Sequence, residues 1–198
     1  MAFPKTFDAF IPCNLTQFLS LTKFKPDYVS LETLRSIPLG AASSTSFSYA
    51  EKLTPPDVFI HCTRCYYFAL AFLYNGFPSN TPGVPQITLE ELTQRLYLTC
   101  ILHDIGLTTT EEGSEHPASK MSFELHGGIM AYEHLQASMD SARLGDIVQS
   151  IMLHTSQWNE GNVSAVTQLI TLSAFLILED RAARGIYCAC GRVVVKSV

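Results

Sequence analysis

The stretch TLEELTQRLYLTCILHDIGL, residues 88–107, decides the fold of this chain. Thr88 and Glu91 form a capping box, in which a hydroxyl side chain and an acid three residues later satisfy free N–H groups at the start of a helix. The leucines that follow recur at three- and four-residue intervals, which is the spacing of one buried helix face. The stretch therefore predicts an amphipathic helix that leads to His103 and Asp104.

Similar patterns elsewhere predict a molecule built from helices. Besides residues 88–106, the expected helices are 31–37, 57–75, 122–139, 146–156 and 164–181. The first 55 residues or so are rich in Pro, Ser and Thr, so an irregular segment that wraps the bundle is expected there. No alternation of the strand type is apparent before residue 185. The predicted fold class is all-α, a bundle of about five to six helices.

Composition excludes several classes of protein. Hydrophobic residues make up 47% of the 198 residues and charged residues 16%, which excludes an intrinsically disordered chain. The net charge is −5, whereas nucleic-acid-binding domains usually carry a basic patch. The longest apolar stretch, residues 165–178, is too short and too polar to cross a bilayer, and the N-terminus has no signal-peptide core. We therefore expect a cytoplasmic protein with free thiols and no nucleic-acid or membrane partner.

The cysteines have two interpretations. Cys62 and Cys65 have C-x2-C spacing and Cys188 and Cys190 have C-x-C spacing, so a four-thiolate zinc site is one of them. However, the first pair lies inside a helical pattern rather than in a tight turn. Because free cysteine is among the most frequently buried residue types, buried structural thiols are the preferred interpretation.

Three histidines lie on the apolar sides of separate predicted helices. They are His61, His103 and His154, and Asp104 follows the second of them directly. An ionised carboxylate inside a protein needs a cation or strong hydrogen-bond donors beside it. Imidazole together with carboxylate is a ligand set that suits zinc, iron or manganese. The pattern therefore points to a divalent metal site as well as to ordinary core histidines.

Four motifs in a fixed order reveal a family resemblance. They are FIHCTRCYYFALA at 59–71, LTCILHDIGLTTT at 98–110, SKMSFELHGGI at 119–129 and QSIMLHTSQ at 149–157. Together they resemble the HD-domain superfamily of metal-dependent enzymes and, within it, the fungal cyanamide hydratases, over about residues 50–176. The resemblance implies an HD metal-binding domain at 51–181, preceded by a wrapping segment at 1–50 and followed by an atypical tail at 182–198.

The resemblance assigns roles to particular residues. It implies that His61, His103 and Asp104 are metal ligands, with zinc as the expected ion and iron or manganese as alternatives. It places His154 at the pocket, as a ligand or a polar neighbour with a catalytic role. Lys120 falls near the expected pocket mouth, where it is either catalytic or a solvated loop lysine.

Further polar residues near these motifs have weaker assignments. Arg64 matches the H-x-x-R pattern of the family and would support Asp104 or a pocket carboxylate. Glu124 is either a pocket residue or an acid favoured by the helix dipole at a helix N-terminus. Among the remaining histidines, His116 and His134 are expected to be solvated, and His126 is left open.

The C-terminal part departs from the family pattern. HD enzymes complete the metal site with an Asp on a later helix, and the gap-free alignment places Ile177 there. Asp180 lies three residues further on, so a shift of one helical turn would supply the ligand. The tail RAARGIYCACGRVVVKSV, residues 181–198, has a strand-like composition that does not fit a helical core.

These observations predict a metal-dependent hydratase that adds water to a small nitrile-like substrate, with cyanamide to urea as the reaction implied by the resemblance. An HD phosphohydrolase is the alternative enzyme, but it needs cations for phosphate and has only Arg64, Arg95 and Lys120 near the motifs. A third alternative is a degenerate, non-catalytic HD module. Ile177 at the place of the expected Asp and the atypical tail support this alternative. The expected partner is a small-molecule substrate, and a homo-oligomer is left open.

Overall fold

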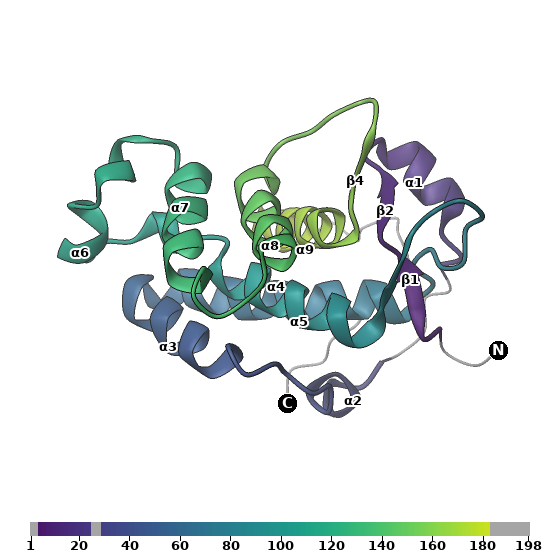
Figure 1. Ribbon diagram of the computed structural model, residues 1–198, viewed down its shortest axis with the longest axis horizontal. Helices are drawn as coiled ribbons and strands as arrows, with labels where there is room; N and C mark the ends of the chain where they lie inside the picture. The colour runs from purple at the N-terminus through teal and green to yellow at the C-terminus, as the bar shows by residue number, and fades with distance from the viewer. Residues whose placement is uncertain (1–3, 25–28, 183–198) are drawn as a thin grey trace.

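The computed structural model describes residues 4–24 and 29–182, with side chains described as far as Phe175. It confirms the all-α prediction, because most of these residues are helical (Figure 1). The α-helices are α1 (Leu15–Leu21), α2 (Leu31–Arg35), α3 (Ser43–Leu53), α4 (Pro56–Tyr74), α5 (Leu89–Leu102), α6 (Glu111–Ser114), α7 (Phe123–Leu135), α8 (Ser141–Leu153) and α9 (Ala165–Ala182). Two short 3-10 helices are η1 (Ile105–Leu107) and η2 (Pro117–Lys120).

The sequence located the long helices but not the short elements. The expected helix at 146–156 begins earlier, at Ser141, because the Asp140 side chain caps it by accepting from the amides of Ala142 and Arg143. Helices α1 and α3 were not expected, since their segments are rich in hydroxyl residues. The structure also contains strands that the sequence did not reveal, because each has three residues, too few for a visible alternation.

The short strands tie the N-terminal segment to the helical bundle. Strand β1 (Thr6–Asp8) pairs antiparallel with β3 (Gln86–Thr88), and β2 (Phe10–Pro12) pairs antiparallel with β4 (Asn162–Ser164). These partners directly precede α5 and α9. The N-terminal segment thus positions the first residues of the two helices, on which it forms small two-stranded sheets.

Helix α5 lies between two hydrophobic clusters. Leu92, Leu96 and Cys100 belong to the cluster that α5 forms with α4, α9 and the N-terminal segment. Ile101 and Leu102 belong to the second cluster, which α5 forms with α3, α7 and α8. Because both of its sides are packed, α5 is held firmly, and so is the His-Asp pair at its C-terminal end.

A contact between glycines brings α7 against the end of α5. A Cβ atom on Gly127 would lie 3.1 Å from the backbone nitrogen of Gly106, and one on Gly106 would overlap the carbonyl oxygen of Phe123. Only glycine allows backbones to approach so closely. Gly106 and Gly127 therefore mark the place where the two backbones come closest.

None of the helices in the described ranges has the length and apolar character needed to span a membrane.

Candidate metal centre

Three helices bring the predicted ligands together. His61 lies in the second turn of α4, His103 is the C-cap of α5, and His154 is the C-cap of α8. Asp104 follows α5 directly. All four residues are buried, with exposed fractions between 0% for His103 and 8% for His61. Residues that the sequence predicted as ligands and as a pocket histidine thus form one buried cluster.

The donor atoms of these side chains converge on the Asp104 carboxylate. The Nε2 atoms of His61 and His103 lie 3.6 Å and 3.3 Å from its Oδ2, and the Nε2 of His154 lies 3.7 Å from its Oδ1. The Nε2 atoms of His61 and His103 are themselves 3.3 Å apart. Three imidazoles therefore face one carboxylate from three directions.

Backbone carbonyls fix the protonation pattern of two imidazoles. The Nδ1 of His103 lies 2.8 Å from the carbonyl oxygen of Cys100, and the Nδ1 of His154 lies 2.7 Å from that of Ile151. Since a carbonyl oxygen can only accept, each Nδ1 must carry the proton and donate it. The neutral rings then present the lone pair of Nε2 to the centre. Metal-binding histidines typically use their second nitrogen in this way.

The spacing of the donor atoms fits a divalent ion. With metal–ligand bonds of about 2.0–2.1 Å, two donors at the corners of a tetrahedron are about 3.3–3.4 Å apart. The distances among His61, His103 and Asp104 are 3.3, 3.3 and 3.6 Å. The described residues therefore contain a group of donors compatible with a divalent metal ion.

Burial sets the charges in the centre. It lowers the pKa of His103 and of His154 to about 4, so both rings are neutral at pH 7 and available as ligands. Burial also raises the pKa of Asp104, while the nearby His154 and His61 act in the opposite direction. Within the described residues, the ion-pair partners of Asp104 are histidines and include no Lys or Arg. A bound cation would supply the missing positive charge.

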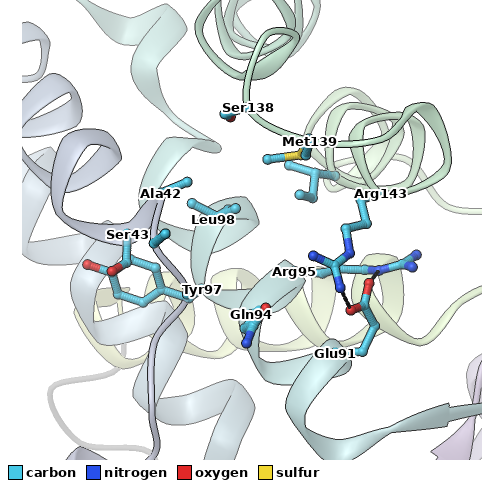
Figure 2. A pocket seen from close by; sticks show the side chains of 13 residues that line it. Ala42, Ser43, Glu91, Gln94, Arg95, Tyr97, Leu98, Ser138, Met139 and Arg143 are labelled. Atoms are coloured by element: carbon cyan, nitrogen blue, oxygen red, sulfur yellow. Dashed lines mark hydrogen bonds and ion pairs between the residues drawn. The ribbon is translucent and has the colours of Figure 1, made fainter.

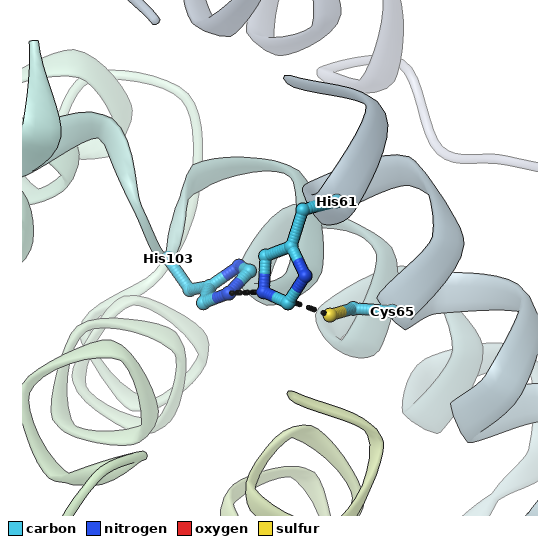
Figure 3. Close-up of side chains that lie close together, drawn as sticks. All are labelled: His61, Cys65 and His103. Atoms are coloured by element: carbon cyan, nitrogen blue, oxygen red, sulfur yellow. Dashed lines mark hydrogen bonds between the residues drawn. The ribbon is translucent and has the colours of Figure 1, made fainter. Parts of the chain in front are cut away.

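Two cysteines also reach the centre, which the sequence did not predict. Cys65 forms a group of potential ligands with His61 and His103 (Figure 3), and Cys62 forms one with His103 and Asp104. Both thiols are free and buried, as the preferred interpretation of the cysteines predicted. The one-turn spacing of His61 and Cys65 was the signal for this contact. The other half of the four-thiolate alternative, at Cys188 and Cys190, lies outside the described residues.

The other predicted pocket residues differ in their relation to the centre. Lys120 is exposed at the end of η2, and in the described part of the chain it makes no hydrogen bond or ion pair. Glu124 accepts a hydrogen bond of 2.7 Å from Thr155, the neighbour of His154. Partial burial raises the pKa of Glu124, but this hydrogen bond and others lower it below its ordinary value overall. The guanidinium of Arg64 lies over the ring of Phe68, at 5.9 Å from its centroid.

The prediction that His116 and His134 are simply solvated is wrong. His134 stacks on Tyr49 with ring centroids 4.2 Å apart, and its Nε2 lies 3.1 Å from the hydroxyl oxygen of Ser46. Both partners belong to α3, and because the sequence did not predict α3, this cover was missed. His116 is also partly buried and caps η2 by accepting from the amide of Ala118.

His126, which the sequence left open, is buried on α7. Its ring centroid is 5.2 Å from that of His116. Burial lowers the pKa of His126, and the proximity of His116 lowers it further. It is therefore a neutral core histidine at pH 7.

The predicted closing ligand cannot be placed with the other donors. Positions 177 and 180 belong to the backbone of α9, but the side chains of Ile177 and Asp180 lie outside the described part of the structure, as does the tail from residue 183.

A cavity of about 130 Å³ lies near the other end of α5. Figure 2 shows that Glu91, Arg95 and Tyr97 of α5 line it together with Arg143 of α8. None of the four residues of the buried histidine–aspartate cluster is among its lining residues. The cavity is therefore separate from the candidate metal centre. Both of its arginines are paired with carboxylates.

Comparison with known proteins supports one enzyme family. No family model matches the chain. Over 130 residues, 64% of the chain, it is 30% identical to the cyanamide hydratases DDI2 and DDI3 of Saccharomyces cerevisiae. The aligned part covers 51% of each of these enzymes, so the chain spans about half the length of the curated relatives it matches.

Proposed function

We propose that this chain is a metal-dependent hydratase of the HD type that converts cyanamide to urea. The observation that carries the proposal is the convergence of three imidazole Nε2 atoms on one buried carboxylate. The similarity to the two yeast cyanamide hydratases supports the choice of reaction. The low charge content of the chain, 16%, agrees with a small uncharged substrate.

In this proposal His61, His103 and Asp104 hold a divalent ion, and zinc is the ion that best suits two imidazoles and a carboxylate. When bound, such an ion activates water at neutral pH and polarises a nitrile. Asp104 balances part of its charge. The carbonyl of Cys100 keeps the proton of His103 on Nδ1 and orients the ring.

The proposal gives His154 the task of moving the proton. Addition of water to a nitrile forms a carbon–oxygen bond, and one proton passes from the water to the nitrile nitrogen. Because the pKa of His154 is lowered to about 4, mainly by burial, its Nε2 is unprotonated at pH 7 and can accept this proton. It then delivers the proton to the nitrogen, and the resulting isourea rearranges to urea. The exposed Lys120 is the other candidate for this task.

The alternative, phosphohydrolysis, is less well supported by the charges. Phosphate recognition needs unpaired cationic groups. Arg95 is engaged by Glu91 at 2.8 Å and by Asp146 at 2.9 Å. Arg64 stacks on an aromatic ring, so phosphate recognition would have to use the exposed Lys120. The same reasoning, together with the net charge of −5, argues against nucleic acid as a partner, and we propose a small molecule instead.

The test is a urea-release assay with the zinc-loaded chain and cyanamide, run beside a panel of nucleoside monophosphates. Urea production without phosphate release is the expected result. Phosphate release without urea would favour phosphohydrolysis, and a zinc-loaded protein without either activity would favour the degenerate module.

A further inference from the structure

A sulfur atom borders the candidate metal centre, and the proposed chemistry does not use it. Cys65 follows His61 by one turn of α4, and its Sγ lies 3.5 Å from the Nε2 of His61. That nitrogen in turn faces the Nε2 of His103 at 3.3 Å (Figure 3). The three donor atoms all lie within 4.8 Å of one another, and all three residues are buried.

These distances match the geometry of a mixed ligand set. Bonds of about 2.3 Å from zinc to sulfur and about 2.0–2.1 Å to nitrogen place tetrahedral sulfur and nitrogen donors about 3.5–3.6 Å apart. The observed separation of the Cys65 sulfur and the His61 nitrogen is 3.5 Å. The one-turn spacing brings the two side chains to the same face of α4, and the distance between them is the one that two ligands of a zinc ion would have.

We propose that Cys65 is a sulfur ligand of the ion in this centre, which then has nitrogen, oxygen and sulfur donors. The inference rests on the metal centre of the proposed function and adds a ligand that the sequence did not predict. A thiolate donor favours zinc over harder ions such as manganese or magnesium. It also supplies a second negative charge beside Asp104, so the bound divalent ion is fully neutralised.

The neighbouring cysteines are less suited to this role. The sulfur of Cys62 lies within 4.8 Å of donor atoms of His103 and Asp104, so Cys62 is the rival ligand. Cys65 is preferred because its sulfur lies 3.5 Å from the Nε2 of His61, the spacing expected of two zinc ligands. Cys100 is fully buried in the hydrophobic cluster around α4, α5 and α9, and what it offers the centre is its carbonyl oxygen, which binds His103.

X-ray absorption at the zinc edge tests the assignment directly. The protein carries one equivalent of zinc in a background with Cys188→Ser and Cys190→Ser, so that the tail thiols cannot contribute. We expect one sulfur at about 2.3 Å in addition to nitrogen and oxygen ligands at about 2.0–2.2 Å. Cys65→Ser should remove the sulfur contribution and weaken zinc binding at least ~10-fold, whereas Cys13→Ser, at a free cysteine outside the centre, should keep both.

Three results would overturn the proposal, and they separate it from the proposed function. Zinc bound only by nitrogen and oxygen in the parent protein would refute the role of Cys65 and leave the metal centre intact. A sulfur signal that persists in Cys65→Ser and vanishes in Cys62→Ser would move the ligand to Cys62. Failure of the parent protein to retain zinc would refute the metal centre as well. The parent spectrum decides the first and last of these even if a variant does not fold.

Discussion

The two ends of α5 place charged groups in opposite ways. Near its N-terminal end, Glu91 is paired with Arg95 at 2.8 Å and also with Arg143, and Arg95 reaches Asp146 at 2.9 Å. Just beyond its C-terminal end, Asp104 faces imidazoles at 3.3–3.7 Å. The first group contains its own permanent cations, whereas in the described structure the second contains imidazoles, of which those of His103 and His154 are neutral at pH 7.

This difference separates a structural charge cluster from a binding site. Guanidinium groups stay protonated at any physiological pH, so the carboxylates at the N-terminal end are balanced by the chain itself. A buried carboxylate with neutral neighbours is costly unless it gains a proton or a cation. The buried carboxylate of Asp104 lies among the histidines at the C-terminal end of α5 despite this energetic cost, which is expected of a site that binds an ion.

The largest effect is expected from His103→Ala, which removes the ligand at the middle of the cluster. The parent protein should carry about one zinc or similar ion per chain. The variant should carry almost none, because it loses one of the three proposed ligands and keeps only His61 and Asp104. Elemental analysis after dialysis measures this. His116→Ala, which removes an imidazole outside the centre, should retain the metal. Equal metal content in the parent and in His103→Ala would show that the C-terminal end of α5 is not a metal-binding site, and the contrast with the N-terminal end would disappear.

The second prediction concerns the stability of the metal-free protein in acid. Burial lowers the pKa of His103 to about 4, against 6.5 in the unfolded chain. Between these values the unfolded chain binds a proton that the folded chain does not, so stability is fully present above pH 6.5 and is lost as the pH falls towards 4. His103 alone should account for about 2 kcal/mol between pH 7 and pH 5, and His154 acts in the same direction. The raised pKa of Asp104 opposes this at the acid end.

Urea unfolding at a series of pH values measures this effect. His103→Gln, which cannot be protonated, should flatten the pH dependence. A parent protein whose stability does not change between pH 7 and pH 5 would show that the histidines are not held neutral by burial.

The long helices and the core of the site could be predicted from the sequence because their signals are local. The capping box at Thr88 and the leucine spacing after it locate α5, and the Thr88 hydroxyl does accept from the amide of Glu91 at 3.2 Å. The histidines on apolar helix faces are brought together in the structure, although their roles as ligands remain a prediction.

What the sequence missed depends on contacts between distant segments. Helix α3 has few apolar residues, and Leu53 and Ala50 become recognisable as core only once α5 and α7 cover them. The environment of His134 follows from that helix, so it could not be predicted either. The three-residue strands form only because the N-terminal segment reaches the starts of α5 and α9. The approach of Cys65 to His103 likewise depends on how α4 packs against α5.

The third prediction asks whether a carboxylate on α9 strengthens the centre. Helices α4 and α9 are antiparallel, because the loop after α4 and the start of α9 both bind the segment at Asp8 and Ala9. Ser173 of α9 contacts Cys65, so position 177, one turn further along α9, comes level with His61. Ile177→Asp should therefore raise metal retention by ~10–100-fold, and Asp180→Asn should have little effect.

Equilibrium dialysis against a zinc buffer measures both variants. The reverse result, in which Asp180→Asn removes the metal, would assign the ligand to Asp180 and shift the alignment by one turn. If neither change matters, α9 contributes no ligand, and the degenerate module gains support.

The smallest effect is expected at the N-terminal end of α5, from Arg95→Met. Burial alone would lower the pKa of Arg95, but the hydrogen bonds to Asp146 and Glu91 raise it above its ordinary value, so the pair is favourable in the folded state. Its side chain is 20% exposed, and losing it should cost about 1–2 kcal/mol of unfolding free energy, between the values for exposed and buried pairs.

Arg143 still accompanies Glu91, and methionine fills much of the same volume. Metal content and urea production should therefore equal those of the parent, and part of the stability loss should disappear at high salt because the pair is partly exposed. Urea unfolding at low and high salt, with elemental analysis of the same samples, measures the two quantities together. Loss of metal on the scale of His103→Ala would mean that the ion pairs position the His-Asp end through the helix, and the two ends would then form one functional unit.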